Sequence, residues 1–410
     1  MPKLLIITQV YPPDPAAVGQ HLHEVATAVT RKGWSCSVWT ANRGYENPNE
    51  RFAAREELQG VDVRRLPASS FGKGSIFVRL LGQGSFLIQV LVRVLFGPKP
   101  DRLLISTSPP LVGLVAWLAR RLRGVPVTYW LMDLNPDQAV ALGAFKPGHV
   151  FVRLFDWMNR RILKAAETTI VLDRFMEAKV RQKVADAHVV VIPPWAPEGV
   201  APQSGNGECR IVNGECGKAN AFRREHGLEG KTVFMYSGNH SWVHPLTTIL
   251  EATRRVAERT DWVFVFVGGG KGKAEVEAFI AKHRPENVRS LPYQPLENLP
   301  VSLAAADVHM VVMGDAMVGC VHPCKIYGVV ALGCPVLGLG PAESHIGEIV
   351  EGEQLGERID HGDVDGAVAA IQRLAELSPE ARSAIRDRAG ALMEERFDRK
   401  RLIEAVVGEL

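Results

Sequence analysis

Short apolar runs alternate with longer amphipathic stretches along the whole chain. The runs at 3–8, 103–106 and 127–131 are rich in β-branched and leucine side chains, which predicts strands buried on both faces. The stretches at 19–32 and 111–123 instead carry apolar residues at helical spacing, which predicts amphipathic helices. Strands and helices that alternate in this order predict parallel sheets built from βαβ units.

The pattern stops once and then restarts, which predicts two α/β domains. Residues 198–224 are rich in Gly, Pro, Asn and Glu and show no apolar period, so we interpret them as a linker with an insertion. The predicted N-terminal domain is therefore 1–197 and the C-terminal domain is 225–397. We expect the last helix, 398–410, to pack back on the N-terminal domain.

Composition and charge limit the classes of function that this protein can have. The chain has 410 residues, of which 46% are hydrophobic and 23% charged, as in globular proteins with more than one core. A net charge of +3 argues against a broad nucleic-acid surface. Six cysteines in a chain of this length predict reduced thiols in a cytoplasmic protein. The opening strand is too short for a signal peptide, and no apolar run approaches the ~20 residues that span a bilayer.

The segment 71–96 has two interpretations of equal weight. It holds Lys73, Arg79 and Arg93, no acidic residue, and many large apolar side chains. It fits an interfacial helix on an anionic membrane, or a long buried helix of the first domain. In the membrane interpretation, the residues that enter the interface are Leu80, Leu81, Phe86, Leu87, Leu91 and Phe96. The protein would then be cytoplasmic and peripheral on the inner face of the cell membrane.

A second helical stretch carries a basic stripe. The side chains in question, at 151–164, are Arg153, Arg160, Arg161 and Lys164. Such a stripe can meet anionic lipid, but a solvated helix face is the commoner interpretation.

The most informative stretch is 307–339. It reads as a buried strand, a loop with two glycines, a helix that ends at Gly333, and a second strand that begins after Pro335. His322, Lys325 and Tyr327 cluster at the helix start, beyond the carboxyl end of the first strand. Open α/β sheets bind ligands at this place, and a helix N-terminus with cationic neighbours suits phosphate. An ordinary βαβ unit with a solvated lysine is the alternative.

Other polar turns follow strands in the same way. Gly238, Asn239 and His240 follow the strand at 233–236, and a glycine-rich turn with Lys271 follows the strand at 262–267. The first strand lacks a Gly-x-Gly-x-x-Gly fingerprint and the glycine-rich turn lacks Walker spacing. A dinucleotide-dependent dehydrogenase and a P-loop ATPase are therefore disfavoured.

Metal binding is a weaker alternative. Cys320, His322 and Cys324 alternate, so an extended loop would place three ligands on one side. No fourth ligand stands nearby in the sequence, and we expect no metal site.

Two Rossmann-like halves joined by a linker resemble the GT-B fold of nucleotide-sugar glycosyltransferases, with the two domains facing a cleft. The segments 235–239, 331–336 and 347–350 look like glycosyltransferase family 4. Asp133-x-x-Pro136-Asp137 and Pro323-x-Lys325-Ile326-Tyr327 look like its branch that builds bacterial surface polysaccharides.

This resemblance implies a retaining hexosyltransferase that uses a nucleotide-diphosphate sugar and needs no cofactor. Its acceptor would be a saccharide, in particular a lipid-linked one. Asp133 would orient or deprotonate the acceptor hydroxyl, and Lys325 would stabilise the leaving diphosphate. The residues expected around the donor are Gly19, Gly238, Asn239, His240, His244, Gly269, Gly270, Lys271, Tyr293, His322, Pro323, Lys325, Ile326, Tyr327, Glu343, Ser344 and Glu348.

The sequence departs from the family pattern at several positions. Cys320 and Gly328 stand where two glutamates are common, and Asn239 and His244 stand where an arginine and a lysine usually hold the pyrophosphate. Met132 stands where the family commonly has a histidine. Two alternatives therefore remain: a nucleotide-sugar epimerase of the same fold, and a catalytically impaired nucleotide-sugar-binding protein.

Overall fold

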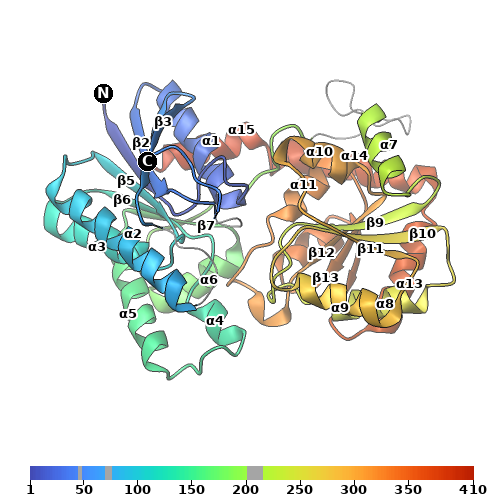
Figure 1. Cartoon of the computed structure of the whole chain (residues 1–410). Coiled ribbons are helices and arrows are strands. Elements are labelled where there is room, and N and C mark those ends of the chain that lie inside the picture. The colour runs from blue at the N-terminus through green and yellow to red at the C-terminus, as the bar shows by residue number, and fades with distance from the viewer. Residues whose placement is uncertain (45–48, 70–75, 201–215) are drawn as a thin grey trace. The chain divides into compact units, whose positions relative to one another are not determined.

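The computed structural model describes residues 1–44, 49–69, 76–200 and 216–410 (Figure 1). The chain forms two compact units. The first unit comprises Met1–Pro194 with Gly319–His322 and Lys400–Leu410, and the second comprises Trp195–Val318 with Pro323–Arg399. Lys73 of the segment 71–96 and Cys209, one of the six cysteines predicted to be reduced, lie outside the described residues. The side chains of Arg79 and Leu80 are not described either.

Within the described residues, the first unit is built on an eight-stranded sheet of order β3-β4-β2-β1-β5-β6-β7-β8. Only the edge strand β3 runs antiparallel to its neighbour. Central strands such as β1 are buried on both faces, as their continuous apolar runs predict. The strands are β1 (Lys3–Ile7), β2 (Ser35–Ala41), β3 (Arg55–Leu58), β4 (Val61–Leu66), β5 (Arg102–Ser106), β6 (Val127–Trp130), β7 (Thr168–Val171) and β8 (Val189–Val191).

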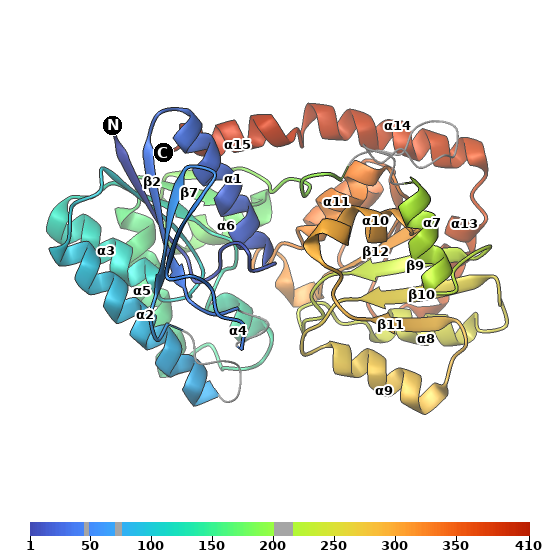
Figure 2. The ribbon, with the colours of Figure 1, turned by 45° about the horizontal axis from the view of Figure 1, so that its top comes forward.

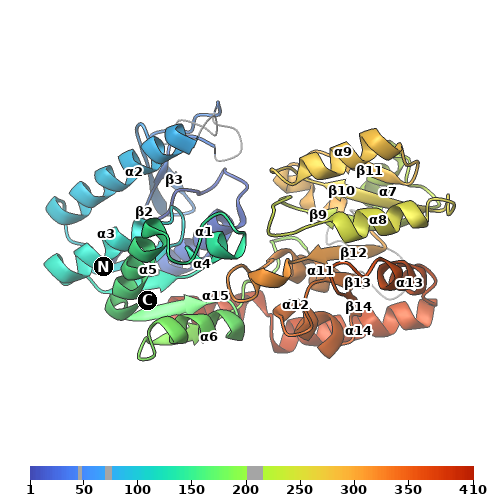
Figure 3. The same ribbon diagram turned by 90° about the horizontal axis from the view of Figure 1, so that it is seen from below.

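Helices cover both faces of this sheet. The helix α1 (Ala17–Arg31) lies on one face, and α2 (Ile76–Phe96), α3 (Val112–Arg123) and α5 (Val150–Ala165) pack side by side in that order on the other (Figure 3). Right-handed crossovers explain the split, because the chain leaves β1 in one direction along the sheet and leaves β5 in the other. The remaining helices are α4 (Asp137–Ala141), α6 (Arg174–Lys183) and α15 (Arg399–Gly408).

The C-terminal residues belong to the first unit. The Thr128 hydroxyl donates to the carbonyl of Glu409 at 2.9 Å, and the Thr168 hydroxyl donates to the Glu409 carboxylate at 3.1 Å. These bonds join the end of α15 to β6 and β7.

The segment predicted as either a membrane helix or a core helix is α2, and it has two apolar faces. One face is buried in the first unit and carries Phe86, Val90 and Val94. The opposite face is exposed and carries Leu81, Ile88, Val92 and Phe96. The expectation that Phe86 enters a lipid interface was wrong, because its side chain is part of the core. No helix among the described residues is long and apolar enough to cross a membrane.

The described part of the second unit contains a six-stranded, wholly parallel sheet of order β11-β10-β9-β12-β13-β14. Alternate residues of β9 enter different cores: Phe234 and Tyr236 on one face, Val233 and Met235 on the other. The strands are β9 (Thr232–Ser237), β10 (Trp262–Val267), β11 (Val288–Leu291), β12 (Val308–Val312), β13 (Val336–Leu339) and β14 (Gly356–Ile359).

Two groups of helices cover the second sheet (Figure 2). One face carries α8 (Thr247–Arg255), α9 (Lys273–His283) and α13 (Val364–Ala375). The other carries α7 (Cys216–Glu225), α10 (Leu299–Ala304) and α11 (Lys325–Leu332), with α14 (Pro379–Glu395) packed on α11. A single turn, α12 (His345–Gly347), follows β13. The helix α7 was not expected, because it falls in the stretch that we interpreted as a linker without periodic structure.

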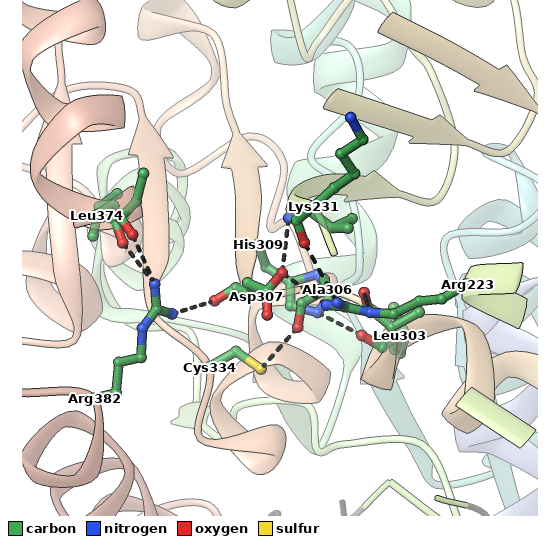
Figure 4. A network of polar contacts seen from close by, with 12 residues as sticks. Arg223, Lys231, Leu303, Ala306, Asp307, His309, Cys334, Leu374 and Arg382 are labelled. Carbon is green, nitrogen blue, oxygen red and sulfur yellow. Dashed lines mark hydrogen bonds and ion pairs between the residues drawn. The ribbon is translucent and has the colours of Figure 1, made fainter. Parts of the chain in front are cut away.

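Asp307 forms hydrogen bonds to several elements at the edge of this sheet where the strands begin (Figure 4). Its carboxylate accepts from the Arg223 guanidinium at 2.7 Å and from the Val233 backbone N–H at 2.8 Å. Its carbonyl accepts from Arg382 of α14 at 3.2 Å. These bonds hold α7, β9 and α14 at the edge opposite the loops that carry the candidate chemistry.

Candidate active site

The central strands β9 and β12 define a switch point in the second sheet. From β9 the chain moves outward through β10 to β11, whereas from β12 it moves the opposite way through β13 to β14. The loops after these two strands therefore diverge, which opens the place where α/β sheets bind ligands. The loop after β9 contains Gly238, and the helix after β12 begins at Lys325.

Glycines let the turns after β9 and β10 pack against each other. Gly238 and Gly270 have φ of +130° and +113°, a region that favours glycine. A Cβ on Gly238 would lie 3.3 Å from the Lys325 Nζ atom, and one on Gly269 would lie 2.8 Å from the Tyr293 ring. The backbone N–H of His240 donates to the Gly269 carbonyl at 2.7 Å. The structure thus brings together the residues predicted from three successive strand ends.

Two lysines of the glycine-rich turn have different neighbours. The Lys273 ammonium donates to the carbonyls of Gly268 and Leu291 at 2.7 Å each, so it joins the turns after β10 and β11. The Lys271 ammonium lies 5.1 Å from the centroid of the exposed Trp242 ring. Lys271 is therefore the lysine of this turn whose side chain is available to a ligand.

Lys325 is the first residue of α11, and its Nζ atom is sealed from solvent. This atom lies 3.6 Å from the centroid of the Tyr236 ring. It has no hydrogen-bond partner in the described part of the chain. Burial lowers the pKa of Lys325 to about 7, because a buried ammonium without a counter-charge is unfavourable. An anion at this position would supply the missing partner.

His240 and His244 are neutral at pH 7. Burial, and after it the nearby charge of Lys325, lowers the pKa of His240 to about 4 and that of His244 to about 3. The Nδ1 atom of His240 lies 3.1 Å from the Gly238 carbonyl, which can only accept, so Nδ1 carries the proton. His244 likewise bonds to the backbone of Val312.

Each imidazole therefore presents a bare nitrogen as an acceptor. Among the described residues, His240 Nε2 and His244 Nδ1 have no partner. A neutral ring nitrogen with a lone pair accepts hydrogen bonds from hydroxyls and does not neutralise phosphate. Both histidines were expected around the donor, and their protonation fits contact with donor hydroxyl groups better than contact with the diphosphate.

The residues that flank Lys325 are packing residues. Ile326 and Tyr327 are buried, and the Tyr327 ring packs edge-on against Phe397 with centroids 4.9 Å apart. Both side chains are enclosed by protein, so their predicted contact with the donor stays a prediction. Pro323 is also buried, and its carbonyl accepts from the Ile326 backbone N–H at 3.2 Å.

The turn after β13 carries three further predicted residues. Ser344 is buried and caps α12, where its hydroxyl accepts from the Gly347 backbone N–H at 3.2 Å. Glu343 is exposed and Glu348 is half-buried. Ser344 therefore has a structural role, whereas both glutamates remain candidates for hydroxyl contacts.

His322 belongs to the first unit, and its predicted contact with the donor stays a prediction. Its Nδ1 atom lies 2.7 Å from the Asp173 carboxylate, which also caps α6 by accepting from the Met176 backbone N–H at 2.7 Å. The Cys320 sulfur lies 2.9 Å from the Lys179 ammonium. These separate partners disfavour the alternative in which Cys320 and His322 act as ligands of one metal.

Asp133 follows β6 at the carboxyl edge of the first sheet. Its backbone N–H donates to the Thr107 hydroxyl at 3.2 Å, which ties the loop after β6 to the loop after β5. Burial raises the pKa of Asp133 to about 6, so its carboxyl group can gain or lose a proton near neutral pH. Such a group can act as a general base.

Gly19 lies in the first turn of α1, at the same edge of the first sheet. A Cβ here would lie 3.0 Å from the Tyr11 Cα atom, so only glycine allows this close approach. Its predicted position near the donor phosphate stays a prediction, because the other donor residues belong to the second unit.

Two contributors were missed from sequence. The Tyr236 ring lies beneath Lys325, and its hydroxyl donates to the Asn239 carbonyl at 2.9 Å. Thr107 positions the backbone of Asp133. The sequence signal that could have indicated Tyr236 and Thr107 is their position at the ends of predicted strands, next to polar turns.

Comparisons with known proteins agree with this architecture. The sequence model of the glycosyl transferase 4-like domain matches residues 16–195, and that of glycosyl transferases group 1 matches residues 231–376. The chain is similar to WcaI of Escherichia coli (strain K12), a protein assigned to colanic acid biosynthesis as a glycosyl transferase. The two are 25% identical over 362 residues, which cover 85% of this chain and 86% of WcaI.

Solved structures share the fold. WaaG, a glycosyltransferase involved in lipopolysaccharide biosynthesis, aligns with a TM-score of 0.72 and 15% identity over 98% of both chains. HepE of Anabaena in complex with UDP-glucose aligns with a TM-score of 0.68 and 16% identity over 100% of both chains.

The two parallel-sheet units define an α/β protein of the GT-B class, as the sequence predicted. The two sequence models together match most of the chain, and the protein belongs to the glycosyltransferases of the family 4 kind. It is accordingly a transferase, and the prediction of its family is confirmed.

Proposed function

We propose that the protein is a retaining hexosyltransferase that uses a nucleotide-diphosphate sugar as donor. The observation that carries this proposal is the buried, unpartnered Nζ atom of Lys325 at the switch point of the second sheet. An amine in that state gains a partner when a diphosphate binds, and it then stabilises the leaving group as the glycosidic bond breaks. The complexes of HepE with UDP-glucose support this choice of donor.

The surrounding residues would orient the donor. Gly238, Gly269 and Gly270 bring backbone close to the ligand, with Asn239 and Lys271 at its rim. His240, His244, Tyr293, Glu343 and Glu348 would contact hydroxyl groups or the base. In the first unit, Asp133 would act on the acceptor hydroxyl as orienting group or base.

We propose a lipid-linked saccharide as acceptor, in the synthesis of a cell-surface polysaccharide at the inner face of the membrane. The similarity to WcaI supports the pathway class, and the exposed apolar face of α2 supports contact with a bilayer. Peripheral binding through this face would combine apolar contacts with Arg93, which is also exposed.

A thermal-shift screen against nucleotides and nucleotide sugars tests the donor assignment. A ligand that binds only the native state raises the melting temperature, and we expect nucleotide diphosphates to do so more than monophosphates. Product analysis with a polyprenyl-linked saccharide then tests transfer and the anomeric outcome. Binding of no nucleotide at all would contradict the proposed function.

A further inference from the structure

Three buried nitrogen atoms gather at the switch point of the second sheet. The imidazole of His240 packs edge-on against the Tyr236 ring with centroids 4.8 Å apart, and the same ring contacts the Nζ atom of Lys325. The charges of Lys325 and His240 both act on His244. In the described part of the chain, Lys325 Nζ, His240 Nε2 and His244 Nδ1 have no hydrogen-bond partner. The proposed diphosphate supplies a partner for Lys325 but leaves the two histidine nitrogens unexplained.

The backbone fixes which nitrogen of each imidazole carries the proton. His240 Nδ1 lies 3.1 Å from the carbonyl oxygen of Gly238, which can only accept. His244 bonds to the backbone of Val312 in a contact that favours the charged imidazole, so the backbone atom is the carbonyl oxygen. The other tautomer of either ring would break this bond and set a lone pair against a carbonyl. His240 Nε2 and His244 Nδ1 therefore accept hydrogen bonds and do not donate them.

A hydroxyl or amide N–H is the ligand group that fits these two nitrogens. It donates its hydrogen to a bare imidazole nitrogen, whereas a carboxylate brings only lone pairs. A carboxylate could bind only if an imidazole took up a proton. His240 is 1% exposed and His244 is 9% exposed, and such burial disfavours the charged imidazole.

The charged side chains of this site also disfavour a second anionic group beside the diphosphate. Lys273 donates to two backbone carbonyls at 2.7 Å each, and Lys271 is exposed at the rim. Lys325 is the buried lysine that faces the proposed diphosphate. Glu343 and Glu348, in the turn after β13, add negative charge. A further carboxylate would therefore meet lone pairs and glutamates, and not a buried cation.

We propose that His240 and His244 are specificity-determining residues that select a donor with a neutral sugar, such as a hexose or an N-acetylhexosamine, and reject uronic acids. This inference rests on the proposed function, which places the donor diphosphate at Lys325. The sugar is bonded directly to the diphosphate, so it lies next to Lys325 and the two histidines. Buried acceptors reject a ligand that leaves them unpaired, which gives the site its selectivity.

A matched pair of nucleotide sugars tests the selectivity with the full-length protein. UDP-glucose and UDP-glucuronate share the nucleotide and the ring, and differ in a hydroxymethyl or carboxylate group. GDP-mannose and GDP-mannuronate form such a pair if GDP gives the larger thermal shift. Isothermal titration calorimetry at neutral pH measures both dissociation constants. We expect the uronate to bind about ten- to a hundredfold more weakly, the effect of a carboxylate without a partner.

Variants of the two histidines should relax this selectivity. In His244→Lys the new ammonium pairs with a carboxylate, so the affinity ratio of neutral sugar to uronate should fall at least about tenfold. The ratio is decisive because the added lysine also attracts the diphosphate that both ligands share. In His240→Gln the side-chain amide can donate, so the ratio should fall without any added charge. His283→Lys adds the same charge at an exposed position of α9, and this matched control should keep the wild-type ratio.

Two results would overturn the proposal. One is equal affinity of wild type for the two sugars of a pair, because the histidines would then face another part of the donor. The other is an unchanged ratio in both His244→Lys and His240→Gln, in proteins that thermal melts show to be folded and that still bind the nucleotide diphosphate. An equal fall of the ratio in His283→Lys would also count against it, since general charge would explain the selectivity. Binding of no nucleotide at all would instead reject the proposed function.

Discussion

The Nζ atom of Lys325 lies 3.6 Å from the centroid of the Tyr236 ring, at the switch point of the second sheet. The face of an aromatic ring attracts a cation, so Tyr236 favours the charged form of Lys325 while burial disfavours it. The outcome is a pKa lowered to about 7, mainly by burial. The protein thus holds an amine that an anionic ligand would charge fully.

Replacement of this amine should weaken donor binding. Lys325→Ala removes a charge-assisted hydrogen bond to the diphosphate, so we expect its affinity to fall by ~1.5–3 kcal/mol. Isothermal titration calorimetry with the nucleotide diphosphate that gives the largest thermal shift measures the change. Lys282→Ala, which alters an exposed lysine of α9, is the control and should bind normally. Equal affinities in the two variants would remove Lys325 from the donor site.

The affinity for a nucleotide sugar should also depend on pH. Lys325 has a pKa of about 7 in the free protein, and a bound diphosphate raises it because the ammonium gains a counter-charge. Binding then takes up a proton above pH 7, so the dissociation constant should rise by up to about tenfold per pH unit there and level off below pH 7. A diphosphate diester keeps a constant charge over this range. Lys325→Arg, which stays protonated, should bind with a flat profile; a profile as steep as wild type would contradict the assignment.

The Tyr236 ring should contribute through its face. Tyr236→Leu removes the cation–π contact, and we expect a loss of about 0.5–2 kcal/mol in diphosphate affinity. Tyr236→Phe keeps the ring and loses only the hydroxyl bond to Asn239, so its affinity should stay near that of wild type. Calorimetry on both variants decides the point. If the Phe variant loses as much affinity as the Leu variant, the hydroxyl bond matters and the ring does not.

Much of this candidate site could be predicted from local patterns in the sequence. The order of strand, loop, helix and strand in 307–339 was enough to place Lys325 at a helix start beyond a carboxyl edge. The glycines after β9 and β10 were recognisable because their turns interrupt apolar runs. Such features depend on residues close together in the chain, and local periodicity reports them well.

The features that could not be predicted depend on contacts between residues far apart in the sequence. The buried Tyr327 ring packs against Phe397. His322 pairs with Asp173, which lies 149 residues earlier in the chain. Nothing in the chain around these residues indicates their partners. For α2, apolar residues on most sides left the buried face undetermined, and packing against α3 decided that Phe86 lies inside.

Asp133 should govern turnover without affecting donor affinity. Asp133→Asn keeps the shape of the side chain but removes its ability to accept a proton, so we expect kcat to fall by about 10²–10⁴. Donor affinity should stay near wild type. Asp133 belongs to the first unit, whereas Lys325 and the glycine turns after β9 and β10 belong to the second. Steady-state kinetics and calorimetry measure the two quantities. Asp186→Asn, which alters an exposed carboxyl of the same unit, is the matched control.

The pH profile identifies the form of Asp133 that acts. Burial raises its pKa to about 6, so the carboxylate predominates above pH 6 and the neutral acid below it. If the carboxylate orients or deprotonates the acceptor hydroxyl, kcat/KM for the acceptor, measured at saturating donor, should fall about tenfold per pH unit below 6 and level off above it. Thr107→Val removes the acceptor of the Asp133 backbone N–H, so it should lower kcat while the acidic limb remains. An acidic limb that persists unchanged in Asp133→Asn would assign the titration to another group and remove Asp133 from the reaction.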